Sequence, residues 1–274
     1  MASVALDNSG TINLAAAAHA TASTDAYAYA YANYGIYQYA YGTDAAASAT
    51  LTNAAGAVID ISASANANAT DGGEASAYAY NYYGVYQDAY AYGTGNDASA
   101  TINNSGELKV DTVAHATAGT EAYAYAYNYY GIYQYASAED GAASASLTNA
   151  AGGTVNISAD AHAVASEGGA TAYAYNYEYV LDQYAYAYGT DDAATVTLTN
   201  GGDLGIKANA VATGASEAYA YAYNYYPLYQ YAYAGDGSAS VTLTNGADAT
   251  LDISTHAQAS ATDGEASAYA YDYY

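Results

Sequence analysis

A short asparagine motif recurs along the whole chain at nearly regular intervals. One form reads aliphatic-x-Asn and the other Ala-Tyr-Asn, with the variants Ala30-Tyr31-Ala32 and Ala270-Tyr271-Asp272. Adjacent motifs are about 24 residues apart on average, and the pattern of intervals repeats after 96 residues. The motif asparagines are Asn8, Asn53, Asn81, Asn104, Asn128, Asn149, Asn176, Asn200, Asn224 and Asn245. So regular a repeat predicts an array of similar structural units.

Between the motifs, small or apolar residues alternate strictly with polar or tyrosine residues. Ile59, Ile61 and Ala63 would share one face of a strand, with Asp60 and Ser62 on the other. Alanine favours helices, but no 3.6-residue period is present. We therefore predict an all-β fold, a β-solenoid (β-helix) of about twelve coils of about 24 residues. Four coils would form each 96-residue superrepeat, and the rod would be roughly 58 Å long.

Composition predicts a thin solenoid interior and restricts the partners. The chain has 40 Tyr but no Phe, Trp or Cys, and too few aliphatic residues to fill a globule of 274 residues. We expect one repeat array over residues 1–274, uncapped or cut from a longer array. Lys109 and Lys207 are the only basic side chains, and the net charge is -25. This disfavours nucleic acid as a partner, and the absence of a ~20-residue apolar run disfavours membrane insertion.

The motif asparagines fall in the buried phase, just before turns. Stacked coil upon coil, their amides would form a structural corner ladder, which avoids the cost of burying an unpaired polar group, ~1 to 3 kcal/mol. A second amide series also falls in the buried phase, and we assign it a packing and hydrogen-bonding role. It consists of Gln38, Gln87, Gln134, Gln183 and Gln230.

No residue pattern indicates catalysis or a resident metal. With 24-residue coils, His19 and His115 would lie four coils apart, too far to share a metal ion. Acidic residues gather at turns, for example Asp191 and Asp192. We expect no cofactor, with calcium at these acidic turns as the alternative.

In the alternating pattern, tyrosine occupies the same set of positions as serine. This predicts that the tyrosine side chains point outward. An apolar ring with a polar tip suits a contact surface. In alternate coils, Thr-x-Thr pairs would occupy the same outward positions as the tyrosines. Tyrosine would then interrupt the rows of threonine, and this interruption argues against an ice-binding surface. The candidate contact residues are Tyr27, Tyr29, Tyr31, Tyr37, Tyr39, Tyr41, Tyr78, Tyr80, Tyr123, Tyr125, Tyr127, Tyr219, Tyr221 and Tyr223.

The combination of Leu-x-Asn-x-x-Gly-x-x-Ile-x-Ile, alternating alanine runs and Gly-Ile-Tyr-Gln resembles the β-solenoid repeat regions of large bacterial surface and secreted proteins. Autotransporter passengers and haemagglutinin-like adhesins are examples. The resemblance implies export, surface display and adhesion or matrix assembly, without catalytic residues.

We therefore expect a noncatalytic structural or adhesive repeat protein, extracellular or on the cell surface, that displays rows of tyrosine. Its expected partners are further copies stacked end to end into a fibre or surface layer, and also polysaccharide or cell surfaces. The main alternative is a matrix protein in which tyrosines relay oxidising equivalents or form dityrosine. A polysaccharide-cleaving solenoid is a third hypothesis, disfavoured because the acidic residues lie at turns.

Overall fold

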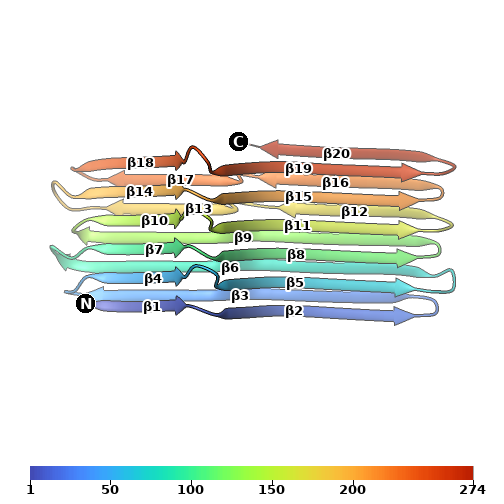
Figure 1. The fold of residues 1–274 in the computed structure, drawn as a ribbon, viewed down its shortest axis with the longest axis horizontal. Coiled ribbons are helices and arrows are strands. Elements are labelled where there is room, and N and C mark those ends of the chain that lie inside the picture. The colour runs from blue at the N-terminus through green and yellow to red at the C-terminus, as the bar shows by residue number, and fades with distance from the viewer. Residues whose placement is uncertain (274) are drawn as a thin grey trace.

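The computed structural model describes residues 1–273, and its secondary-structure elements are all strands. The strands stack in parallel into three sheets that extend from the first coil to the last (Figure 1). Sheet A comprises β1 (Ala2–Asn8), β4 (Ala47–Asn53), β7 (Ala98–Asn104), β10 (Ala143–Asn149), β14 (Ala193–Asn200) and β18 (Ser238–Asn245). Sheet B comprises β2 (Thr11–Ala22), β5 (Val58–Ala69), β8 (Glu107–Ala118), β11 (Thr154–Ala165), β15 (Asp203–Gly214) and β19 (Thr250–Ala261).

Sheet C is the widest of the three. Its first three layers are single long strands, β3 (Ala26–Thr43), β6 (Glu74–Thr94) and β9 (Glu121–Asp140). The next layers are split into β12 (Gly169–Asn176) with β13 (Leu181–Ala187), and β16 (Glu217–Tyr225) with β17 (Leu228–Ala234). The last strand is β20 (Glu265–Tyr273). The all-β solenoid predicted from the sequence is thus confirmed.

The predicted coil length is wrong. Asn8 pairs with Asn53, which pairs with Asn104, so like residues stack after 45 and then 51 residues. One coil therefore holds one layer of each of the three sheets and about 48 residues, the interval that separates Asn128 from Asn176. The 96-residue superrepeat is two coils rather than four, and sheets A and B each contain six strands. At ~4.8 Å per coil the stack is about 29 Å high, half the predicted length.

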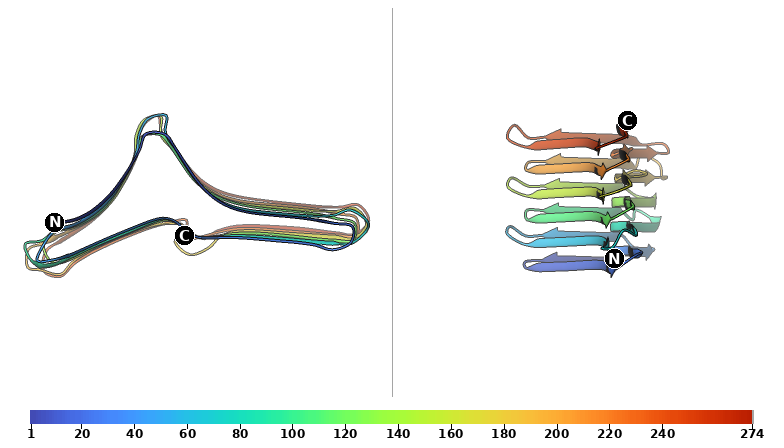
Figure 2. Two further views of the ribbon diagram at one scale, coloured as in Figure 1. Left: turned by 90° about the horizontal axis from the view of Figure 1, so that it is seen from below. Right: turned by 90° about the vertical axis from the view of Figure 1, so that its right-hand side faces the viewer.

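Seen end-on, each coil is a flat triangle (Figure 2). Sheets A and B meet at a raised corner, and sheet C forms the long base, which bends near its middle. The interior beneath the raised corner is filled by Leu, Ile and Val, including Leu51, Ile59 and Val85. The two narrow arms are filled almost entirely by alanine, as in the layer of Ala65, Ala77 and their stacked equivalents.

Side-chain volume explains this shape. Cα atoms of β5 and β6 come within 8 Å of each other, closer than the ~10 Å typical of packed sheets. Larger aliphatic side chains hold the sheets apart only under the corner. The thin interior lined with small side chains follows the alternation in the sequence.

The Thr-x-Thr pairs and the tyrosines do not share a face, in contrast to the sequence-based expectation. The Thr-x-Thr pairs lie on sheet A, and the register places Thr50 beside Thr101 and Thr197 beside Thr242. The tyrosines lie on sheet C. No tyrosine interrupts the threonine rows, because the two motifs occupy different sides of the same coil rather than alternate coils.

Candidate contact surface

The 39 described tyrosines lie in the strands of sheet C or in the segments directly flanking them. In the first half of β3, buried alanines alternate with exposed tyrosines. Tyr27 and Tyr37 expose 64% and 53% of their surface. The base of the triangle therefore presents an almost unbroken layer of phenol rings, here called the tyrosine face.

In-register pairing stacks the rings into rows along the solenoid. One row runs through Tyr29, Tyr78, Tyr125, Tyr173, Tyr221 and Tyr269, and a second through Tyr31, Tyr80, Tyr127, Tyr175, Tyr223 and Tyr271. Ring centroids of successive coils lie 4.8 Å apart for Tyr173 and Tyr221 and 4.9 Å for Tyr175 and Tyr223, with rings nearly parallel. These separations lie in the range of favourable aromatic contact.

The structure brings the sequence-derived candidates onto this one face, although some of their rows are mixed. Tyr27, Tyr123 and Tyr219 alternate with Ser76, Thr171 and Ser267. Sequence reasoning omitted the tyrosines of the fourth and sixth coils and those beyond the bend in the second, third and fifth coils. Tyr86, Tyr133, Tyr173 and Tyr184 are examples. Their signal was the same alternation with alanine.

Two aspartates replace tyrosine in rows beyond the bend. Asp88 stands between Tyr39 and Tyr135, and Asp182 between Tyr133 and Tyr229. Although they project from the outer side of the sheet, they are only 5% and 1% exposed. The surrounding rings cover these shorter side chains. Desolvation raises the pKa of Asp88 to about 6 and that of Asp182 to about 8.

Several phenols of the tyrosine face have a raised pKa. Burial, followed by repulsion from neighbouring phenolates, raises the pKa of Tyr125 to about 12. The same causes raise the pKa of Tyr186 to about 12. A neutral phenol can both donate and accept a hydrogen bond, so the face combines apolar ring area with polar tips.

Three ladders of stacked side-chain amides join the sheets to one another, and two of them lie in the sheet that carries the tyrosine face. At the raised corner each asparagine Nδ2 donates to the Oδ1 of the next asparagine, from Asn8 through Asn245, over 2.7–2.9 Å. The same nitrogens donate to main-chain carbonyls of the following coil, for example from Asn8 to Val58 at 3.0 Å. These asparagines therefore join sheets A and B at every level.

A second asparagine ladder lies in sheet C and faces sheet B. Asn128 donates to Asn176 (3.1 Å), Asn176 to Asn224 (2.8 Å) and Asn224 to Asp272 (2.8 Å). Asn81 occupies the equivalent place but has no hydrogen-bond partner for either side-chain atom. Asn128 Oδ1 instead accepts a hydrogen bond from the Thr112 hydroxyl.

The glutamines form a third ladder, between sheets C and A. Gln87 donates to Gln38 over 2.7 Å, and Gln134, Gln183 and Gln230 continue the series at 2.8 Å. Gln38 Nε2 also donates to the Thr50 carbonyl of sheet A (2.8 Å). The two ladders of sheet C flank the central aliphatic layer and separate it from the alanine arms.

Sheet A presents a second uniform surface, here called the hydroxyl face. Its outward positions are Ser or Thr except for Ala5, Asp7, Asn103 and Ala193. Neighbouring hydroxyls contact each other across coils, as between Ser99 and Ser48 (3.1 Å). Its hydroxyl rows are Ser3, Ser48, Ser99, Ser144, Thr195 and Ser240; Thr50, Thr101, Ser146, Thr197 and Thr242; and Thr52, Thr148, Thr199 and Thr244.

Sheet B carries the mixed polar surface. Lys109 pairs with Glu107 and Lys207 with Asp252, and such exposed pairs stabilise little. His115 and His162 lie in adjacent coils with rings stacked at 5.0 Å, and His19 is two coils from His115 rather than four. Within residues 1–273 no group of three or more His, Asp and Glu side chains is placed to hold a metal ion.

Acidic residues at the turns bind main-chain N–H groups of adjacent coils. Asp192 Oδ2 accepts from the Gly141 amide (2.6 Å), and Asp97 Oδ1 from the Ala142 amide (2.9 Å). These carboxylates fasten one turn to the next.

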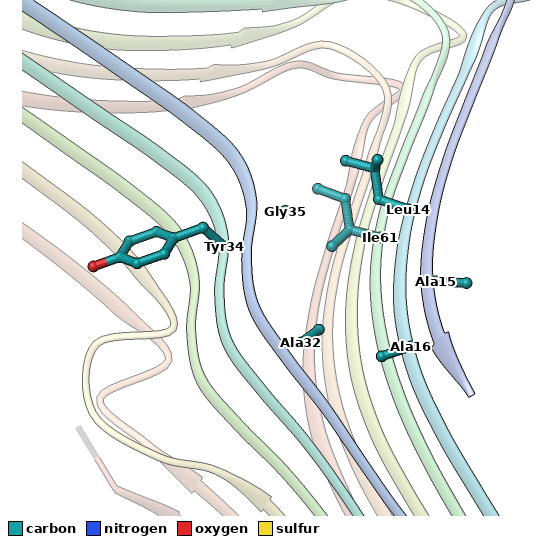
Figure 3. Close-up of a pocket in the computed structure, with 7 residues that line it drawn as sticks. All are labelled: Leu14, Ala15, Ala16, Ala32, Tyr34, Gly35 and Ile61. Atoms are coloured by element: carbon teal, nitrogen blue, oxygen red, sulfur yellow. The ribbon is translucent and has the colours of Figure 1, made fainter. Parts of the chain in front are cut away.

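One shallow hollow of about 240 Å³ lies at the first coil, lined by Leu14, Ile61 and Gly35 among others. Figure 3 shows Leu14 and Ile61 pointing into the interior near Gly35, whereas Tyr34 points away on the other side of β3. The hollow is the open end of the aliphatic layer.

Residues 1–273 contain no helical segment with the length and apolarity of a membrane span. In comparisons with known proteins, no family model, no curated protein and no solved structure matches this chain.

Proposed function

We propose that this chain is a noncatalytic structural repeat protein, extracellular or on the cell surface, whose tyrosine face makes adhesive contacts. The observation that carries this proposal is the confinement of tyrosine to one broad outer face. Tyrosine combines a large, rigid apolar ring with a hydroxyl and is enriched at protein interfaces. The sequence resemblance to bacterial surface solenoids supports the location.

The adhesive role is tested by replacing exposed rings without disturbing the interior. Tyr29, Tyr31 and Tyr37 each expose about half of their surface, and threonine keeps their strand preference. The triple Tyr→Thr variant is expected to lose at least half of the binding to insoluble polysaccharide or to immobilised copies of the chain. A matched variant with Thr50, Thr101 and Thr197 changed to Ser should bind as the wild type. Equal binding by both variants would reject the tyrosine face as the contact surface.

We also propose that copies stack end to end. Among the described residues nothing pairs with the outer edges of β1 and β2 at one end or of β18 and β19 at the other. Unpaired edges are templates for further strands. The ladder of asparagines at the raised corner could continue from one copy into the next. At its first member, Asn8 Oδ1 accepts only from the Gly10 amide within the described chain. At its last member, Asn245 Nδ2 donates only to the Ala249 carbonyl. Asn245 of one copy could therefore donate to Asn8 of the next.

Proline at the free edge of β1 tests the stacking. Ala2 donates to Ala46, and the alternation of a parallel ladder then directs the N–H of Ala5 away from β4. Ala5→Pro removes that outward donor and keeps the internal ladder. Sedimentation and electron microscopy should show filaments for the wild type and single molecules for Ala5→Pro. Filaments in Ala5→Pro, or none in the wild type at high concentration, would contradict end-to-end stacking.

The hydroxyl face favours a second candidate function, binding of ice. Its hydroxyls repeat at ~4.8 Å along the solenoid and at about 6.7 Å along each strand. Hydroxyls on a rigid sheet can hold water in a repeating layer, and the near absence of charge suits ice better than an ionic mineral. Thermal hysteresis is expected for the wild type and for Ser64→Lys on sheet B. It should be lost in Thr101→Lys, and its absence from the wild type would reject this function.

A further inference from the structure

Beyond the bend of sheet C, three tyrosines and the two buried aspartates form one connected cluster. The Tyr86 and Tyr133 rings are stacked with centroids 4.7 Å apart and planes at 13°. The Tyr133 and Tyr184 centroids are 5.9 Å apart. The Tyr86 phenol interacts electrostatically with the Asp88 carboxyl group, two residues along the same strand, and the Tyr184 phenol with that of Asp182. A buried carboxyl group thus stands at each end of a short chain of phenols.

These carboxylates have little else to bind. Asp88 Oδ1 and both side-chain oxygens of Asp182 are buried without a hydrogen-bond partner among the described residues. The groups that Asp88 influences are all phenols, and they come from its own strand and from both neighbouring strands. They are Tyr37 and Tyr39 on β3, Tyr83, Tyr86 and Tyr90 on β6, and Tyr133 and Tyr135 on β9. A buried base beside a phenol is suited to receive the proton that the phenol must lose when it is oxidised.

We propose that this cluster is a site of oxidative cross-linking, in which Asp88 accepts the Tyr86 proton and Tyr86 couples to Tyr133. The inference goes beyond the structural role and does not depend on the tyrosine face being adhesive. The required oxidant is a one-electron acceptor, such as the oxidised haem of a peroxidase that consumes hydrogen peroxide. The exposed Tyr37 ring, stacked on Tyr86 at 5.2 Å, offers an entry point for the oxidation.

Atoms and electrons balance in this coupling. Tyr86 and Tyr133 each lose one electron to the oxidant and one proton, the Tyr86 proton to Asp88 and the Tyr133 proton to solvent. The two phenoxyl radicals join through carbons ortho to their oxygens, and each ring then returns its ortho hydrogen to oxygen to regain a phenol. The sum is one hydrogen peroxide and two tyrosines giving one dityrosine and two waters.

The chain contains a matched internal control. Tyr173 and Tyr221 stack at 4.8 Å and 11°, almost the geometry of Tyr86 and Tyr133. The groups that shift the pKa of Tyr173 do not include a carboxylate. If ring stacking alone decided where coupling occurs, both pairs would cross-link equally. If the buried base decides, the Tyr86–Tyr133 pair should be preferred.

The test uses the full chain and photogenerated ruthenium(III) tris-bipyridyl as oxidant, at pH 7.5, with products cut after glutamate and sequenced by mass spectrometry. Tyr86–Tyr133 coupling joins peptide 75–107 to peptide 122–139, and Tyr173–Tyr221 coupling joins 168–178 to 218–265. General-base assistance is commonly worth 10²-fold or more, so we expect Tyr86–Tyr133 coupling to exceed the control pair at least about tenfold. Asp88→Asn should abolish that preference while leaving coupling of the control pair unchanged.

Two further experiments test whether the coupling depends on the Tyr86 phenol and on an ionised Asp88. Tyr86→Phe retains the ring but removes the phenol, and it should eliminate only the 75–107 to 122–139 product made through residue 86. Lowering the pH through about 6 should reduce the preference in the wild type, because a protonated Asp88 cannot accept a proton. Equal coupling of the two pairs, or an unchanged preference in a folded Asp88→Asn variant, would overturn the proposal.

Discussion

A single threonine, Thr112, explains why the side-chain amide of Asn81 is unpaired in the asparagine ladder of sheet C. Thr112 occupies an inward position that Ala63 and Ala159 hold in the adjacent coils. Its hydroxyl bonds to Asn128 Oδ1, the atom that would otherwise accept from Asn81. Asn81 is consequently buried with an unsatisfied amide, which costs about 1–3 kcal/mol.

Thr112→Ala should therefore leave stability unchanged or raise it by about 1 kcal/mol, because Asn128 can then accept from Asn81. Chemical denaturation of Thr112→Ala, Asn81→Ala and the double variant checks this as a double-mutant cycle. The gain should disappear when residue 81 is alanine. The same effect of Thr112→Ala in both backgrounds would show that the ladder is not repaired.

Asp182 should make the protein less stable as the pH rises. Burial raises its pKa from 3.8 to about 8, so between these values the native state holds a proton that the unfolded chain releases. The free energy of unfolding then falls by about 1.4 kcal/mol per pH unit over this window. The penalty is absent below the lower value and complete above the higher one.

Asp182→Asn should flatten that slope in denaturation experiments between pH 4 and pH 8. Asp236→Asn is the matched control, because Asp236 is an exposed turn residue and its replacement changes the net charge equally. A slope that is the same in both variants would mean that general charge repulsion, rather than burial of Asp182, sets the pH dependence.

At the level of elements, the bend of sheet C depends on stacked glycines. A Cβ atom on Gly84 would lie 2.6 Å from Val110 Cγ2 and closer still to the Gly131 carbonyl oxygen. In the fourth coil the chain instead leaves the ladder between β12 and β13. Glu178 and Tyr179 there adopt positive φ angles of 47° and 33°, and Gly131 and Ile132 both donate to the Val180 carbonyl.

Gly84→Ala should accordingly destabilise the fold by about 1–3 kcal/mol, since main chain cannot move aside as a flexible side chain can. Gly10→Ala is the control, because no atom lies within 4 Å of the place that a Cβ on Gly10 would take. Its effect should stay within about 0.5 kcal/mol in thermal unfolding. A harmless Gly84→Ala would show that the bend can relax.

The sequence predicted the element type and the side-chain faces because alternation with period two is a local signal. It did not predict the coil length, because Leu-x-Asn and Ala-Tyr-Asn both place a buried amide before a bend. Like residues stack on like in this fold, so the interval between identical motifs, such as the 48 residues from Asn128 to Asn176, was the better measure. The Asp88–Tyr86–Tyr133 cluster was likewise invisible, since it spans two coils and needs the register.

The whole molecule presents three chemically distinct sides on one thin frame. Sheet C carries tyrosine, sheet A carries hydroxyls, and sheet B carries the lysines and histidines. In a solenoid each coil contacts mainly its neighbours, so the pattern can be lengthened or shortened in whole coils. The interval from Asn53 to Asn149 is two coils, because Asn53 pairs with Asn104 and Asn104 with Asn149.

Deleting residues 54–149 should therefore leave a shorter folded solenoid, less stable than the parent because two coil interfaces are lost. The junction joins Asn53 to Ala150-Ala151-Gly152, which matches the deleted Ala54-Ala55-Gly56. Deleting residues 54–77 is the contrasting variant. It removes one coil of the length first predicted, and with it all of β5. Circular dichroism and thermal unfolding should show a cooperative β-fold for the first deletion and its loss for the second, whereas a folded 54–77 deletion would contradict the observed coil length.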